Sequence, residues 1–214
     1  FIKYILNKYP DYKVVNFDKL TYAGNLDNLA EVQNNPNYSF VKGDICDAGI
    51  LEKTIQEHKI DVVMNYAAET HVDRSIMDPN AFLKTDVFGV YNLLEAVKKF
   101  NLQKMVQVST DEVYGSIEKG KFTEESTFAP NSPYAASKAG GDLLCRSYFT
   151  TYQTPVAVTH SCNFVGENQY PEKLIPLFIT NLLEGKKVPL YGDGQNVREF
   201  IYKDDHCRAI DVIL

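Results

Sequence analysis

Two short stretches carry the residues of this chain that are best suited to acid–base chemistry. One ends in Thr110, Asp111 and Glu112, and the other holds Tyr134 and Lys138. Residues four apart face each other on one turn of a helix, so a helix here would set the lysine beside the phenol. A nearby ammonium favours the phenolate and lowers its pKa from about 10 towards the working pH. We therefore predict that Tyr134 acts as a base and that Thr110 hydrogen-bonds the same substrate hydroxyl.

The sequence around these stretches predicts the elements that position them. Residues 105–108 form an apolar, β-branched run that is typical of a buried strand, and its carboxyl end would deliver Thr110, Asp111 and Glu112 into a loop. In an open α/β sheet, ligands bind at that edge. Ser132 can cap a helix that starts at Pro133, because proline suits the first helical position.

The amino-acid sequences of these two motifs resemble those of a known family. Residues 109–115 read Ser-Thr-Asp-Glu-Val-Tyr-Gly, and together with the Tyr-x-x-x-Lys at 134–138 they are similar to the extended short-chain dehydrogenase/reductases. Within that group the match is best to the nucleotide-sugar 4,6-dehydratases. The resemblance implies a lyase that uses tightly held NAD to oxidise C4 of dTDP-glucose, eliminates water across C5 and C6, and returns the hydride to C6. Asp111 would be the acid and Glu112 the base.

Other functions remain open at this point. A 4-epimerase is the nearest rival, although its strand end usually lacks the Asp-Glu pair. A dehydratase acting on UDP-glucose or CDP-glucose reads a different base that this sequence does not separate. A catalytically silent, NAD-binding member is a further alternative.

Strands and helices alternate along the chain, which predicts an α/β fold with a doubly wound parallel sheet. Strands are expected at 14–17, 39–41, 61–66, 103–108 and 156–159, and helices at 1–9, 49–58, 79–100, 133–152 and from 204. The resemblance makes this a Rossmann-type NAD-binding domain over 1–159. Residues 160–214 would form part of a small nucleotide-sugar-binding lobe whose segments return to the sheet.

The start of the sequence departs from a complete Rossmann unit. Such a unit opens with a strand and a glycine-rich phosphate loop, whereas Phe1 already lies in what reads as the following helix. The chain also stops at Leu214, soon after a helix begins. We therefore expect it to be an internal piece of a longer protein.

Cofactor contacts are predicted at the ends of several strands. Asp18 ends a strand where an acidic residue accepts hydrogen bonds from ribose hydroxyls and repels a 2′-phosphate, which favours NAD over NADP. The resemblance adds the other residues expected to hold the cofactor: Lys19, Thr21, Asp44, Ile45, Ala67, Ala68, Tyr134 and Lys138.

The resemblance also implies a set of substrate-binding residues: Thr70, His71, Asn163, Glu172, Lys173, Leu174, Pro189, Tyr191 and Arg198. Arg198 would pair with the diphosphate, because the planar guanidinium can make two hydrogen bonds at once. Two places depart from the family pattern. Asp86 stands where the family commonly has asparagine, and the 160–168 segment has His160 and Phe164 in place of arginine and asparagine.

Composition narrows the remaining classes. The net charge of −6, without a basic run, argues against a nucleic-acid or anionic-membrane surface. Four scattered cysteines without a C-x-x-C pair favour free thiols in the cytoplasm, and no complete set of metal ligands is present. We also expect a homodimer, formed by the helices at 79–100 and 133–152 as in the family. Its apolar contacts would come from Phe82, Val87, Tyr91, Leu143, Leu144 and Phe149.

Overall fold

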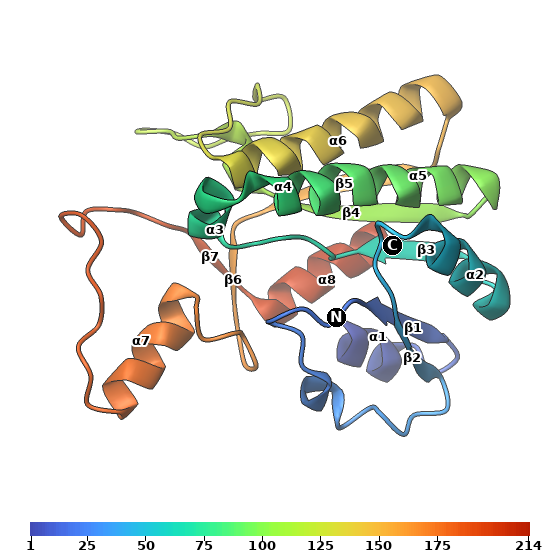
Figure 1. Cartoon of the computed structure of the whole chain (residues 1–214), viewed down its shortest axis with the longest axis horizontal. Coiled ribbons are helices and arrows are strands. Elements are labelled where there is room, and N and C mark those ends of the chain that lie inside the picture. The colour runs from blue at the N-terminus through green and yellow to red at the C-terminus, as the bar shows by residue number, and fades with distance from the viewer.

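The computed structural model describes residues 1–214 as alternating helices and strands (Figure 1). In chain order they are α1 (Ile2–Lys8), β1 (Val14–Asp18), η1 (Leu26–Leu29), β2 (Tyr38–Lys42), α2 (Ala48–His58), β3 (Val62–Asn65), α3 (Val72–Met77), α4 (Pro79–Phe82), η2 (Leu83–Gly89), α5 (Val90–Lys99), β4 (Lys104–Thr110), η3 (Asp111–Tyr114), α6 (Pro133–Tyr152), β5 (Val156–Ser161), β6 (Asn163–Val165), α7 (Leu174–Leu183), β7 (Phe200–Tyr202) and α8 (Lys203–Ile213). All the strands and helices predicted from the sequence are present, and the predicted α/β class is confirmed.

All the strand pairs are parallel. β1 pairs with β2, β3–β4–β5 forms a three-stranded sheet, and β6 pairs with β7. Parallel neighbours need crossover connections. The connection from β3 to β4 contains α5, and the connection from β4 to β5 contains α6, whereas β1 and β2 are joined by a segment with the short helix η1. The carboxyl ends of parallel strands meet at one edge of a sheet, so Thr110 at the end of β4 lies on the edge where α/β proteins bind ligands.

Helices cover the central sheet on both faces (Figure 1). The main core lies between the sheet and α2, α5 and α6, and it contains Leu94, Met105 and Cys145 without any exposed surface. The other face meets α8 and α1, where the Tyr66 hydroxyl hydrogen-bonds His206 at 3.1 Å and the Tyr4 hydroxyl donates to Asp211 at 3.0 Å. This two-sided packing is what a doubly wound sheet requires.

The long helix predicted at 79–100 is continuous but irregular. It consists of α4, the π-helical segment η2 and α5. A π-helical segment widens the backbone by one residue per turn, and such segments often occur at functional sites. Asp86 lies inside η2 and is only 1% exposed. The apolar spacing predicted the helix but not this local widening.

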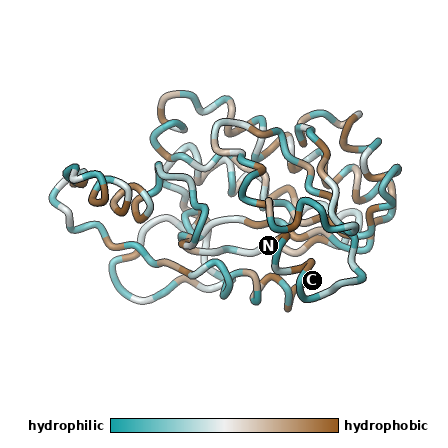
Figure 2. Tube along the Cα trace, turned by 90° about the horizontal axis from the view of Figure 1, so that it is seen from below, coloured by the Kyte–Doolittle hydropathy of each residue, from teal (hydrophilic) through white to brown (hydrophobic).

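The segment after β5 forms a separate small arrangement. β6 and β7 pair with each other, and α7 has no buried residue. Figure 2 shows the hydrophobic turns of α7 projecting from the rest of the chain. β5 itself continues to Ser161 and pairs Ser109 with His160, so the first residues after 159 still belong to the central sheet. None of the helices combines the length and apolar character needed to cross a membrane.

Candidate active site

The turn after β4 presents the predicted acid–base residues. Thr110 caps the short helix η3: its hydroxyl accepts a hydrogen bond from the backbone N–H of Glu112 at 3.2 Å. The same hydroxyl lies 3.3 Å from the Asp111 carboxylate. Val113 and Tyr114 are buried and anchor the turn from below. The cap and the anchor together hold the Asp111 and Glu112 carboxyl groups at the edge of the sheet.

The start of α6 presents the other two predicted residues. The Ser132 hydroxyl accepts from the Ala135 N–H at 3.1 Å, and Pro133 occupies the first turn, as predicted. Lys138 is 3% exposed, and its ammonium donates to the Val108 carbonyl of β4 at 3.0 Å. This hydrogen bond ties the helix that carries Tyr134 to the strand that carries Thr110.

The ionisation of Tyr134 differs from the sequence-based expectation. Burial raises the pKa of its phenol, and the carboxylates of Glu112 and Asp86 raise it further, while the hydrogen bond with Thr110 lowers it. The Lys138 ammonium is directed to a backbone carbonyl instead of the phenol. The expected lowering of the Tyr134 pKa is therefore wrong for this structure, because burial and the negative neighbours disfavour the phenolate while Lys138 donates to a backbone carbonyl.

The two adjacent carboxyl groups both bind protons more tightly than an exposed carboxyl does. Burial raises the pKa of Asp111, with a contribution from the charge of Glu199. Burial also raises the pKa of Glu112, as does the charge of Asp111, whereas Arg198 and Lys173 oppose the shift. A carboxyl group with a raised pKa is a stronger base when ionised and holds its proton more readily, which suits general acid–base roles.

Four predicted substrate residues lie together beyond β3. The Lys173 ammonium donates to the Thr70 carbonyl at 2.5 Å, and burial lowers the pKa of Lys173. His71 Nε2 lies 3.8 Å from the carboxylate of Glu172. The Tyr22 hydroxyl donates to the same carboxylate at 3.0 Å. These contacts join the loop after β3 to the segment before α7, which are far apart in the sequence.

The remaining predicted substrate residues are more dispersed. The Asn163 side chain donates to the Glu199 carbonyl at 3.3 Å, which places it beside the segment that carries Arg198. Leu174 is exposed at the start of α7, and Tyr191 is 67% exposed on the loop that also holds Pro189. That loop runs along the outer side of α7 (Figure 1). The structure does not gather Leu174, Pro189 and Tyr191 around the acid–base residues.

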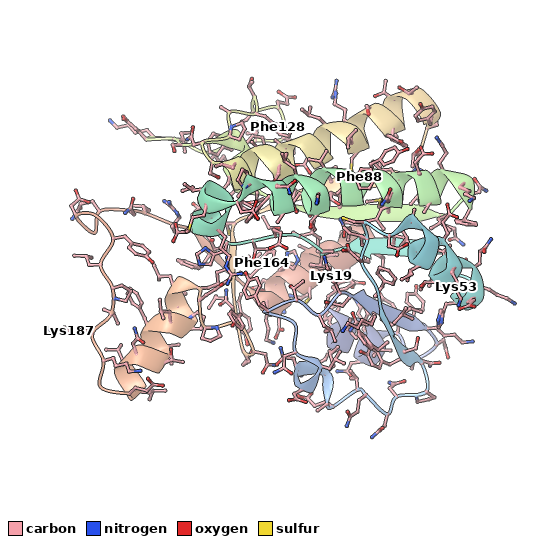
Figure 3. The ribbon with its side chains drawn as sticks, viewed as in Figure 1. Lys19, Lys53, Phe88, Phe128, Phe164 and Lys187 are labelled. Atoms are coloured by element: carbon pink, nitrogen blue, oxygen red, sulfur yellow. The ribbon has the colours of Figure 1, made fainter.

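The predicted cofactor residues lie along the ends of β1, β2 and β3. Asp18 is exposed and accepts from the Leu20 N–H at 2.7 Å. Lys19, labelled in Figure 3, forms an ion pair with Asp44 at 2.7 Å. That pair borders a cavity of about 420 Å³, which is also lined by Cys46, Glu69, Asp78, Asn80, Ala81, Lys84 and Thr85.

Four further predicted cofactor residues differ in their accessibility. Ala67 and Ala68 are partly buried after β3, and the Ala67 N–H donates to the Asn65 side chain at 3.1 Å. Thr21 is exposed. The Ile45 side chain belongs to the hydrophobic core, so only its backbone can face a ligand at this edge.

Sequence analysis missed a buried polar network behind the site. Ser109 of β4 donates to Asp142 of α6 at 2.6 Å, His160 of β5 contacts the same carboxylate at 3.1 Å, and Tyr114 hydrogen-bonds His160 at 2.9 Å. Through His160 of β5, the network links β4, η3 and α6, which carry the predicted acid–base residues. The residues that contact each other in this network lie 18 to 46 positions apart in the sequence, so no local spacing signals these contacts.

Comparison with known proteins places this site in a family. Residues 1–214 match the family described as GDP-mannose 4,6 dehydratase. The chain is 49% identical over 214 residues to the low-salt glycan biosynthesis protein Agl12 of Haloferax volcanii, covering all of the chain and 68% of that protein. It is 49% identical to the dTDP-glucose 4,6-dehydratase of Xanthomonas campestris pv. campestris, covering 94% of the chain and 60% of that enzyme.

Solved structures give the same result. The dTDP-glucose 4,6-dehydratase of Bacillus anthracis in complex with NAD matches with a TM-score of 0.92 and 54% identity, covering 100% of the chain and 66% of that structure. DesIV, the dTDP-glucose 4,6-dehydratase of Streptomyces venezuelae with NAD bound, matches with a TM-score of 0.95 and 50% identity over 99% of the chain and 66% of that structure. The chain thus spans 60 to 68% of the length of these relatives. By sequence and fold, it belongs to the GDP-mannose 4,6 dehydratase family.

Proposed function

We propose that the protein containing this chain is an NAD-dependent dTDP-glucose 4,6-dehydratase. The observation that carries the proposal is the carboxyl pair Asp111 and Glu112, held by the Thr110 cap at the end of β4 with the pKa of both groups raised by burial. Water elimination needs one carboxylate that removes a proton and one carboxylic acid that supplies one. The relatives named dTDP-glucose 4,6-dehydratase, whose sequences are 49% and 54% identical to this chain, support the substrate class.

The strand ends suit a dinucleotide. The carboxylate of Asp18 lies at the strand end where it can accept hydrogen bonds from ribose hydroxyls. The small side chains of Ala67 and Ala68 let a ligand approach the backbone. Asp44 and Lys19 border the adjoining cavity. The NAD-bound relatives support the same assignment. Bound NAD would accept the hydride from C4 of the sugar and later return it to C6.

The residues of the chain would supply the proton transfers. Tyr134 removes the proton of the C4 hydroxyl, and Thr110 orients that hydroxyl. Oxidation at C4 acidifies the C5 proton, which Glu112 removes. Asp111 protonates the C6 hydroxyl as it leaves as water, and Glu112 gives a proton back to C5 when the hydride is returned to C6. Lys173 and Arg198 lie close enough to Glu112 to affect its pKa, so their charges would also act on a diphosphate bound beside it.

Replacing Glu112 tests this proposal. In the full-length protein, Glu112→Gln should still oxidise dTDP-glucose at C4, because Thr110, Tyr134 and Lys138 remain. It should then stop, with reduced cofactor present and no exchange of the C5 hydrogen with solvent. We expect product formation to fall about 10² to 10⁴-fold, which is the usual contribution of a general base.

Tyr134→Phe is the matched comparison. It should slow the first oxidation, so reduced cofactor should not accumulate. Near-parental formation of the 4-keto-6-deoxy product by Glu112→Gln would refute the role of Glu112. Conversion of a UDP-sugar to its C4 epimer by the parent, without loss of water, would point to the rival epimerase activity instead.

We further infer that the protein is a cytoplasmic homodimer. Large apolar side chains remain exposed along the paired helices η2, α5 and α6: Leu83, Phe88, Tyr91, Leu143, Phe149 and Tyr152. Figure 3 shows Phe88 on this helical layer. Of the residues predicted for the interface, Phe82 is instead buried and packs its ring on Tyr134 at a centroid distance of 6.2 Å. The four cysteines are unpaired, which suits a reducing compartment.

A further inference from the structure

A buried carboxyl group lies behind the acid–base residues without a part in the proposed reaction. Asp86 is 1% exposed inside the π-helical segment η2. One carboxylate oxygen accepts from the backbone N–H of Glu69 at 3.3 Å, and the other accepts from the Ser137 hydroxyl at 2.8 Å. Asp86 therefore connects η2, the loop after β3 and the first turns of α6.

The backbones of η2 and α6 are in close contact at this point. A Cβ atom added to Gly141 would lie 2.5 Å from the Asp86 carbonyl oxygen, so only glycine allows this approach. Asp86 is consequently held by its own backbone as well as by its carboxylate. A change in the charge of the carboxyl group thus acts directly on the helix that carries Tyr134 and Lys138.

The Ser137 hydroxyl has two acceptors but only one proton. It lies 2.8 Å from the Asp86 carboxylate and 2.8 Å from the Tyr134 carbonyl. When Asp86 is ionised, the hydroxyl proton points to the carboxylate. When Asp86 is protonated, its own O–H can donate to Ser137, and the Ser137 proton can turn to the Tyr134 carbonyl. Both arrangements use the same atoms at the same distances.

Several charged groups face the Asp86 carboxyl. Lys138 lies on α6 and lowers the pKa of Asp86, whereas Glu69, on the loop after β3, raises it. Tyr134, also on α6, is itself sensitive to the charge of Asp86. α4 contributes no titratable group, and on the first turn of α5 Tyr91 is exposed. Burial outweighs the favourable partners and raises the pKa of Asp86 to about 6.

We propose that Asp86 is a positioning residue whose charge controls Tyr134. When Asp86 gains or loses a proton, its hydrogen bond with Ser137 reverses direction. The proposal rests on the assignment of Tyr134 as the base. A proton from solvent binds to the carboxylate oxygen that faces Ser137. This protonation removes a negative charge that opposes the phenolate of Tyr134. It also weakens the hydrogen bond from the Glu69 N–H, because a neutral acid is a poorer acceptor than a carboxylate.

The charge of Asp86 has opposite effects on the loop after β3 and on Tyr134. Ionised Asp86 holds the loop after β3 against α6, and that loop carries Ala67, Ala68 and Thr70. Neutral Asp86 leaves Tyr134 freer to lose its proton but holds the loop less firmly. Because burial raises the pKa of Asp86 to about 6, the ionised and the neutral forms are both populated within about two pH units of that value.

A titration of the full-length, cofactor-loaded protein measures this protonation without turnover. Carboxyl-carbon NMR should show an aspartate signal that titrates near pH 6 and is missing from Asp86→Asn, whereas the signal of Asp111 should remain. The Glu69 amide proton should shift with the same midpoint, and this shift should also vanish in Asp86→Asn. Asp11→Asn, on an exposed turn, should leave both signals unchanged. An Asp86 signal that titrates near 4, or a Glu69 amide that does not follow it, would overturn the proposal.

Two variants separate the charge from the hydrogen bond. Asp86→Asn is permanently neutral, so the acid limb of its kcat/KM profile should move to lower pH, by a few tenths to about one unit. Ser137→Ala keeps the charge but loses a hydrogen bond that lowers the pKa of Asp86, so the NMR midpoint should move upward. An unmoved acid limb, or a downward midpoint in Ser137→Ala, would contradict the proposed control of Tyr134 by Asp86. Failure to dehydrate dTDP-glucose would leave the NMR results standing and would refute only the proposed function.

Discussion

Burial shifts three carboxyl groups of this protein in the same direction. The pKa values of Asp86, Asp111 and Glu112 are all raised, and burial is the largest cause in each case. Different neighbours oppose the increase in pKa at each group: Lys138 at Asp86, and Arg198 and Lys173 at Glu112. The charged residues around the site therefore decide which group holds a proton at a given pH.

The raised pKa of Asp86 predicts a pH-dependent stability. Ionisation of this group costs more in the folded than in the unfolded protein, so its contribution to stability falls as the pH rises from about 4 through about 6. Above that pH the penalty reaches roughly 3 kcal/mol. Asp86→Asn avoids it. In urea unfolding, the free energy of unfolding of Asp86→Asn should rise relative to that of the parent between about pH 4 and pH 7, and the difference should then stay constant.

Asp11→Asn serves as the control, because the residue is exposed and its variant should follow the parent at every pH. The lost hydrogen bonds of Asp86→Asn add a constant offset that does not change the slope with pH. A difference between Asp86→Asn and the parent that stays constant across this range would show that Asp86 does not titrate there.

Local sequence predicted which elements carry the proposed acid–base residues, but it did not predict the ionisation of Tyr134. Thr110, Asp111 and Glu112 are adjacent, and Tyr134 and Lys138 are one turn apart, so spacing alone groups them. The protonation state of Tyr134 depends on Asp86 and Glu112, which approach it only in the fold. For this reason the expected effect of Lys138 was wrong while the position of Lys138 was right.

At the scale of elements, the contact between η2 and α6 positions the site. The backbone of Asp86 meets Gly141, and Ser137 and Lys138 lie one turn earlier on α6. The helix pattern of 79–100 is apolar at the spacing of an ordinary α-helix, so it contains no sign of the π-helical segment. That segment becomes understandable only with α6 in place, since it brings the Asp86 backbone to the glycine.

Two neighbouring glycines test this contact. A Cβ at Gly141 would lie 2.5 Å from the backbone oxygen of Asp86, which has little room to move. Gly141→Ala should therefore separate η2 from α6, with a loss of about 1–3 kcal/mol in the free energy of unfolding. Gly140→Ala meets the end of the Val87 side chain at 3.1 Å, which can shift. It should be near neutral, or gain up to about 1 kcal/mol from helix propensity.

Urea unfolding of both variants at one pH measures the difference. The Glu69 amide signal adds a local readout, because only Gly141→Ala should weaken the contact between Asp86 and the loop after β3. Equal stability of the two variants would mean that the contact between the helices is looser than the structure has it.

At the scale of the whole molecule, the same helices present two faces with different roles. Their inner face supplies the core through Leu94, Val97 and Cys145, and their outer face leaves large apolar side chains in solvent. Amphipathicity predicted a buried inner face, but it did not separate Phe82, which packs on Tyr134, from the exposed Phe88. Phe82 ends α4 and faces Tyr134 of α6, whereas Phe88 lies within η2 and is 51% exposed.

The outer face predicts the oligomeric state. Leu143 and Phe149 are 55% and 54% exposed on α6, and a second copy that packs there would form a bundle with α5 and its symmetry mate. Replacing both residues by glutamate places charges where apolar contacts would be, so the full-length double variant should have half the parental mass in light scattering at micromolar concentration. Leu182→Glu, at a 65% exposed position on α7, is the control and should keep the parental mass. A parent that is already monomeric, or a double variant that keeps the dimer mass, would rule out this face as the dimer interface. A double variant that becomes monomeric while retaining its circular dichroism spectrum would show that the apolar side chains of α6 hold the two copies together.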